Sequence, residues 1–150
     1  MKIKKLIFIV FALFASFVAS ADVLRGVNEL KIVINDLNEA ALRCTLTNDL
    51  IDASIRLPLS NSKIKILKEN DSSESILYAY VLSFDSGTMC QVYVELSFLK
   101  YIPTEKSYGV FWRKNLILSF RKANVAKSVA EDFESLTKQF VSAWLKANPS

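Results

Sequence analysis

The 150-residue chain has 19 basic and 15 acidic side chains but no histidine, which removes the usual general base and the commonest metal ligand. Residues 1–21 hold three of the lysines and no acid, so residues 22–150 carry 16 basic and 15 acidic side chains, a net charge of +1. Nucleic-acid binding needs a concentrated basic surface, and this balance argues against nucleic acid as a partner.

The beginning of the chain has the layout of a secretory signal peptide. Lysines within the first five residues precede an apolar stretch over residues 6–18, and small side chains at Ala19 and Ala21 precede Asp22. This order predicts cleavage after Ala21 and a periplasmic or secreted protein. The apolar stretch is too short for a comfortable permanent membrane span and no later segment approaches it, so we expect no transmembrane segment after cleavage.

The exported part is long enough for one domain with a buried core. The chain has only 3 glycines and 3 prolines, which argues against disorder, and it shows no repeat or linker. We therefore expect a signal peptide over residues 1–21 and a single α+β domain over residues 22–150.

The first half of this domain mixes strand and helix patterns. Alternation over residues 30–35 predicts a strand, whereas residues 36–45 could form a helical turn or a connection. Thr47 is suited to cap a helix and Asp49 complements the positive end of its first turn, which predicts a helix that ends at residues 60–62.

Four further segments are typical of strands. Residues 63–67 alternate, and residues 76–84 are apolar on both faces, as in a strand covered on both sides or at an interface. Residues 88–102 alternate cleanly, which predicts an antiparallel strand with one wet face. Residues 108–121 form the last strand, with a bulge or bend expected near residues 113–115.

A long amphipathic helix is predicted at the end of the chain, with Asn124 as its cap. Its apolar stripe comprises Val125, Val129, Phe133, Leu136, Phe140 and Trp144. We expect this stripe to pack on the inward face of the strand over residues 88–102. The predicted fold class is α+β, an antiparallel four- to five-stranded sheet with two helices packed on one face.

Cys44 and Cys90 are the only cysteines. In an exported chain an even pair favours a disulfide. Two separately buried thiols, or a reactive thiol with a lowered pKa, are the alternatives. A bridge requires the helix after Cys44 to cover the sheet face of Cys90, so that the α-carbons lie roughly 4.4–6.8 Å apart.

No catalytic or cofactor-binding motif is present. The chain lacks G-x-S-x-G, P-loop and G-x-G-x-x-G sequences, and two cysteines without histidine do not make a zinc site. Asp49 with Asp52, or Glu131 with Asp132 and Glu134, could in principle serve acid–base or calcium chemistry. Each group lies at an expected helix start or on a solvated helix face, so we expect no catalytic residue, metal or cofactor.

Aromatic side chains on the central strands are the remaining functional lead. If Tyr93 shares a face with Tyr78, Tyr80 and Trp112, the sheet side away from the helices carries an aromatic patch. Such a composition is typical of a protein-interaction or ligand surface. Ordinary cross-strand packing, with hydroxyl groups reaching water, is the alternative.

Three segments, residues 43–50, 89–96 and 144–149, resemble small exported bacterial proteins of unassigned function. The resemblance spans most of the exported chain, and the group is expected to have glycine where this chain has Thr45. The layout is also similar to envelope domains in which two helices cover a four-stranded sheet, such as the amino-terminal domain of the TolB type and the lipopolysaccharide-assembly lipoprotein LptE. This chain lacks the lipidation cysteine of the latter, and the resemblance implies no catalytic residue.

These features favour a non-catalytic exported domain that binds another protein of the cell envelope. The alternative is an extracellular enzyme or enzyme inhibitor that uses carboxylates or a free thiol. The sequence leaves the oligomeric state open.

Overall fold

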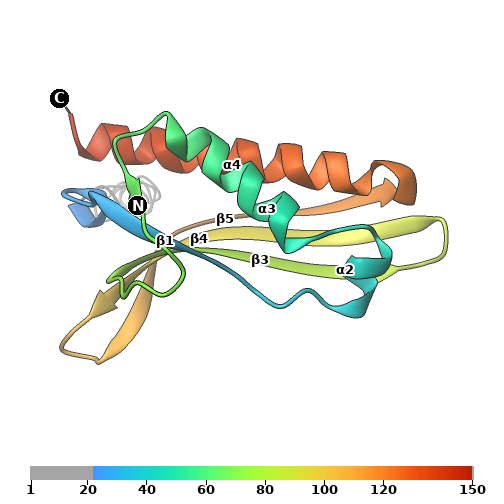
Figure 1. Ribbon diagram of the computed structural model, residues 1–150, viewed down its shortest axis with the longest axis horizontal. Coiled ribbons are helices and arrows are strands. Elements are labelled where there is room, and N and C mark those ends of the chain that lie inside the picture. Colours follow the sequence, from blue (N-terminus) through green and yellow to red (C-terminus); the bar gives the residue numbers. More distant parts are fainter. Residues whose placement is uncertain (1–21, 150) are drawn as a thin grey trace, which may run out of the picture.

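A five-stranded sheet with helices on one face forms the structure, a computed structural model that describes residues 22–149 (Figure 1). The strand order is β2-β1-β3-β4-β5. The elements, in chain order, are β1 (Glu29–Ile34), α2 (Glu39–Arg43), α3 (Asn48–Ser60), β2 (Lys65–Ile66), β3 (Ser75–Asp85), β4 (Met89–Ile102), β5 (Ser107–Arg121), the 3₁₀ turn η1 (Lys122–Asn124) and α4 (Val125–Ala147). The expected signal peptide and its cleavage site lie outside the described residues.

The sheet is mixed, so the prediction of an antiparallel sheet is wrong for its first two strands. β1 runs parallel to β2 and to β3, whereas β3, β4 and β5 are antiparallel to one another. Between β1 and β2 the chain crosses the sheet through α2 and α3, and a return by a helical crossover makes the next strand parallel. The α+β class and the five strands agree with the prediction.

Helices α3 and α4 lie side by side over one face of the sheet, called here the covered face (Figure 1). The whole predicted stripe of α4 is buried there: Val125, Val129, Phe133, Leu136, Phe140 and Trp144. It packs on the inward residues of β4, and the rings of Phe98 and Phe140 have centroids 5.6 Å apart. The interaction predicted between this helix and this strand is therefore confirmed.

The caps of the helices differ from one another. Thr47 caps α3 as predicted, since its hydroxyl accepts a hydrogen bond from the backbone N–H of Leu50 at 3.2 Å. Asn124 precedes α4, but its side chain makes no capping hydrogen bond because the chain enters the helix through η1. The ambiguous segment after β1 forms the short helix α2, which Asn38 caps.

Two asparagines extend the pairing of β3 beyond the end of β1. The Asn35 amide donates to the carbonyl of Val81 at 3.1 Å and accepts from its N–H at 2.7 Å. Asn38 forms the same pair of bonds with Ser83, at 2.8 and 3.3 Å. Side-chain amides thus replace a neighbouring strand where β1 has ended.

The bulge in β5 lies at Phe111 and not at the predicted residues 113–115. Phe98 of β4 pairs with Trp112, and the next residue of β4 pairs with Val110, which leaves Phe111 as the extra residue. The end of the β4–β5 hairpin bends away from the helices (Figure 1), as expected beside a bulge.

Replacing Phe133 with Ala should lower the free energy of unfolding by about 3–5 kcal/mol, because its fully buried ring would leave a cavity between α4 and the sheet. Urea denaturation followed by circular dichroism measures the change. Leu145→Ala on the same helix is the control, since Leu145 is 53% exposed and should cost only about 0.5 kcal/mol. Equal losses in the two variants would contradict the packing.

Candidate functional site

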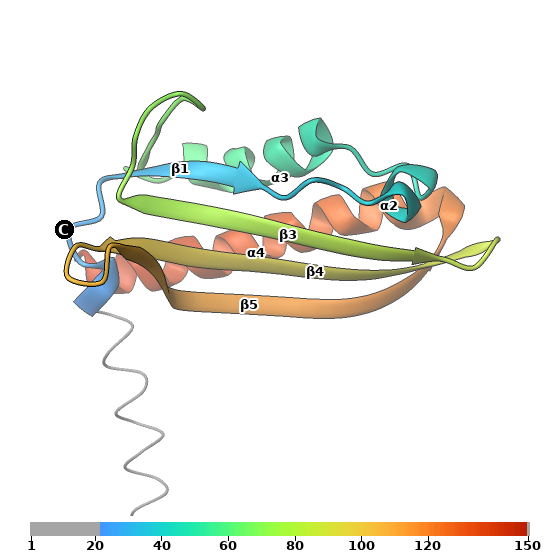
Figure 2. The same cartoon turned by 90° about the horizontal axis from the view of Figure 1, so that it is seen from below.

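The candidate site is the sheet face opposite the helices, called here the open face. Figure 2 shows the sheet in front of α3 and α4, with no described helix across this face. The pairing of Tyr80 with Glu95 and of Leu82 with Tyr93 places these side chains on it. Tyr78 lies on the same face, and the rings of Tyr80 and Tyr93 meet edge to face with centroids 6.0 Å apart. Three of the four residues predicted for the surface are therefore brought together.

Trp112 does not belong to this surface. It pairs with Phe98 on the covered face, and its indole lies edge to face against the ring of Phe140, with centroids 5.5 Å apart. The position of the bulge explains the error. The pairing is regular from Arg121 back to Trp112, so Trp112 lies on the same face as Leu116 and Leu118, and the bulge at Phe111 shifts only the residues before it. A break at the predicted residues 113–115 would instead have placed Trp112 on the open face. Trp112 is thus part of the core boundary.

Large apolar side chains that the sequence did not single out complete the surface. Phe84 is 60% exposed and Ile117 is 78% exposed, and Ile117 pairs with Tyr93 as Leu82 does from the other side. We define the open-face patch as these residues: Tyr80, Leu82, Phe84, Tyr93 and Ile117. The sequence did contain a signal for Leu82 and Phe84, because residues 76–84 are apolar on both faces. That pattern is equally typical of a strand covered by helices on both sides and of a strand at an interface, so it did not predict exposure of these two side chains.

A polar network borders the patch at Glu95. This carboxylate accepts hydrogen bonds from the hydroxyls of Tyr93 and Ser97 at 2.5 and 2.7 Å, and pairs with Arg113 at 3.1 Å. The hydrogen bond to Glu95, assisted by burial and by the negative charge of Glu95, raises the pKa of Tyr93 above its ordinary value of about 10. The hydroxyl of Tyr93 thus donates its hydrogen bond to Glu95 within the sheet.

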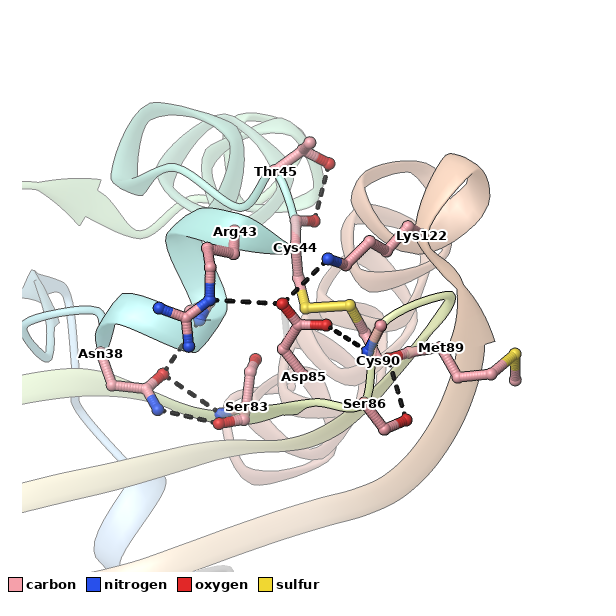
Figure 3. Close-up of a disulfide and its surroundings, with 12 residues drawn as sticks. Asn38, Arg43, Cys44, Thr45, Ser83, Asp85, Ser86, Met89, Cys90 and Lys122 are labelled. Atoms are coloured by element: carbon pink, nitrogen blue, oxygen red, sulfur yellow. Dashed lines mark hydrogen bonds and ion pairs between the residues drawn. A yellow bond between two sulfur atoms is a disulfide. The ribbon is translucent and has the colours of Figure 1, made fainter.

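The two cysteines form the predicted disulfide at the β3–β4 end of the sheet (Figure 3). The α-carbons of Cys44 and Cys90 are 6.3 Å apart, and both residues are fully buried. Because both cysteines of the chain are paired, neither offers the free thiol of the alternative hypothesis. The bond joins the end of α2 to the start of β4.

Asp85 lies beside this disulfide and pairs with two cationic side chains, Lys122 and Arg43 (Figure 3). Its carboxylate accepts from the ammonium of Lys122 at 2.9 Å, from the guanidinium of Arg43 at 3.3 Å and from the backbone N–H of Gly87 at 3.0 Å. The hydrogen bond from Lys122 is the main reason that the pKa of Asp85 lies below its usual value, although burial opposes it. The cluster ties α2 and η1 to the end of β3, which is a structural role.

The carboxylates considered for catalysis lie on α3 and α4, and all but Asp132, which has one oxygen buried without a hydrogen-bond partner, lie at the helix surface. Three of them are ion-paired along their own helices: Asp52 with Arg56, Glu131 with Lys127, and Glu134 with Lys138. Burial is the main cause that raises the pKa of Asp132. Over residues 22–149, no group of three or more His, Cys, Asp and Glu side chains is placed to hold a metal ion. In the same part of the chain, no helix is both long and apolar enough to span a membrane.

No protein-family model and no curated protein sequence matches the chain. Solved structures with a similar arrangement include a minor lipoprotein from Acinetobacter baumannii, with 9% identity and a TM-score of 0.48 over 79% of this chain and 93% of that one. PelC from Paraburkholderia phytofirmans, a dodecamer, has 10% identity and a TM-score of 0.48 over 78% and 88%. A Xanthomonas campestris protein has 13% identity and a TM-score of 0.47 over 79% and 84%. Similarity at this level carries no function from one chain to the other.

Replacing both Cys44 and Cys90 with Ala should lower the free energy of unfolding by about 4 kcal/mol, because the bond closes a loop between residues 46 positions apart. Urea denaturation with and without dithiothreitol measures the effect. The wild type should lose stability on reduction, and the double variant should not respond to the reductant. A wild-type midpoint that is the same under both conditions would contradict the bond's role.

The stability of the protein should fall in acid partly through Asp85. Its pKa is lowered in the folded state, so its contribution is complete above the unfolded value of about 3.9 and is lost as the pH falls through the lower folded value. Asp85→Asn should make the loss of stability below about pH 4 shallower in thermal unfolding. Glu105→Gln, at an exposed turn residue, removes one acid as a control. An identical pH dependence in Asp85→Asn and wild type would contradict this account.

Proposed function

We propose that the protein is a non-catalytic exported domain that binds another protein of the cell envelope through its open-face patch. The observation that carries this proposal is the exposure of Phe84 and Ile117, 60% and 78%, on a sheet face that no described helix covers. Contiguous exposed apolar and aromatic side chains are typical of protein-binding surfaces. The polar group at Glu95 supplies the kind of border that excludes water around such a contact.

Export is part of the same proposal. The buried bond between Cys44 and Cys90 forms and persists in an oxidising compartment, such as the periplasm or the extracellular space. The signal-peptide layout of residues 1–21 supports this location. One hydrophobic cluster extends from Leu24 to Ala147, which supports a single exported domain over residues 22–150.

The geometry does not favour the alternative of an enzyme or an inhibitor. The disulfide occupies both thiols, and three of the candidate carboxylates are held in ion pairs on α3 and α4. These helices lie on the covered side of the sheet, away from the open-face patch (Figure 1).

Phe84→Ser should weaken partner binding roughly 30-fold or more while the fold stays intact. Mature wild-type protein is immobilised and exposed to periplasmic extract from the source cells, and the captured proteins are identified by mass spectrometry. Truncating a central aromatic contact typically costs about 2 kcal/mol or more, roughly a 30-fold loss of affinity. Leu57→Ser is the matched control, because Leu57 is 59% exposed on α3, in the helical layer. Recovery of the same proteins by Phe84→Ser would exclude the patch as the binding surface.

A further inference from the structure

The outer edge of β5 is free in the described structure. β5 is the last strand of the sheet and runs for 15 residues, with β4 as its one partner strand among residues 22–149. An edge strand offers unpaired backbone N–H and C=O groups, which can pair with a strand of another chain. The edge of β5 is therefore a second interaction surface, which adjoins the open-face patch and shares Ile117 with it.

The central part of this edge lacks the usual protection against pairing. Residues 115–120 carry no charge and no proline, and the bulge lies earlier, at Phe111. The charged residues of the strand lie outside this stretch, at Arg113, Lys114 and Arg121. Ile117, in the middle, is 78% exposed, more than any other large apolar side chain among residues 22–149. This stretch is thus open to pairing, with charges at its ends.

The sequence around Ile117 is symmetric in character, which identifies a second copy of this chain as the occupant. A leucine lies on each side of Ile117, at positions 116 and 118, and a polar residue lies beyond each leucine, Asn115 and Ser119. A two-fold contact requires a surface that complements itself. Antiparallel pairing about Ile117 places each Leu116 opposite Leu118 and each Asn115 opposite Ser119.

We propose that two copies pair antiparallel through β5, with Ile117 on the two-fold axis, and join their sheets into one. The exposed Ile117 side chains then cover each other on the open face. Leu116 and Leu118, which are partly buried at the edge of the covered face, become interior. Backbone hydrogen bonds and apolar contacts therefore both form along residues 115–119 of the paired strands.

Two like-charge contacts, related by the two-fold axis, oppose this arrangement. In the same register Arg113 lies opposite Arg121 at each end of the paired stretch. Arg113 is ion-paired with Glu95 at 3.1 Å and its side chain is half exposed to solvent, so its repulsion of Arg121 is weak. In this register residues 115–119 pair with themselves, and Phe120 of each copy lies opposite Lys114 of the other.

The pairing adds to the proposed function and does not rest on it. Strands that join edge to edge lie in the plane of the sheet, so Phe84 and Tyr80 remain available on both copies. The purified protein alone tests the pairing, whereas a binding partner is needed to test the patch. Ile117 belongs to both surfaces, but Phe84→Ser tests the patch and the mass of the purified protein tests the pairing, so failure of one proposal is distinguishable from failure of the other.

Cysteine cross-linking tests the register. In Ile117→Cys the two introduced side chains face each other, with β-carbons about 4.5–5.5 Å apart, so mild oxidation should give covalent dimers on a non-reducing gel. Ser119→Cys is the matched control on the same face of the strand. Its two copies lie four residues apart along the strands, about 13 Å, and should not cross-link. Absence of the Ile117→Cys dimer, or equal cross-linking in both variants, would overturn the proposal.

Light scattering after gel filtration tests the pairing without cysteines. The mature wild type should have twice the monomer mass at high micromolar concentration. Ile117→Lys should give a monomer, since two ammonium groups would face each other on the axis. Val110→Lys, in the same strand but beyond the paired stretch, should remain a dimer with unchanged far-UV circular dichroism. A monomeric wild type, or open-ended aggregates of higher mass, would contradict a closed two-fold contact.

Discussion

The packing of α4 on the inward face of β4 is the contact on which the rest of the structure depends. Phe133 and Phe140 fill the space above Val94 and Phe98, and all four residues are fully buried. Both long helices lie on this side, so the sheet has one covered face and one open face (Figures 1 and 2). β3 is apolar on both faces, and its second face therefore stays in contact with solvent. An exposed apolar surface is a direct consequence of a single helical layer.

The constraints that rigidify the sheet are concentrated at the end where this surface is most apolar. The disulfide from Cys44 to Cys90 and the cations around Asp85 hold the β3–β4 end, next to Phe84 (Figure 3). Thr45, just after Cys44, has φ 63°, a conformation in which glycine is favoured, and glycine is the residue that the resemblance leads one to expect there. A surface held in place before binding loses less entropy on association. The same bonds that stabilise the fold therefore favour tight contact at the open-face patch.

Sequence patterns within a single helix or strand predicted that element well, but they did not predict the direction in which strands pair or the position of the bulge. The period-two alternation of β4 and the stripe of α4 gave both elements and their contact, and the disulfide followed from export and an even pair of cysteines. Alternation carries no information on strand direction, so the parallel pairing of β1 was missed. In the candidate site, Tyr78, Tyr80 and Tyr93 were placed together, but Trp112 was placed on the wrong face, because the bulge lies before it, at Phe111, and not after it, at residues 113–115. A bulge depends on the pairing of two strands, and no local signal marked its position.

The charge of residues 22–150 suggests how the surfaces of the domain should associate. Residues 22–150 have a net charge of +1, and the ionic groups next to the open-face patch, Glu95 and Arg113, already neutralise each other. Long-range electrostatic steering is therefore weak, and binding through the patch or through β5 has to rest on apolar contact and backbone hydrogen bonds. Such contacts are little affected by ionic strength, because salt screens charges and not apolar burial. Two chains joined through β5 would also present two patches on one continuous face, so that a partner with repeated sites could be held at both.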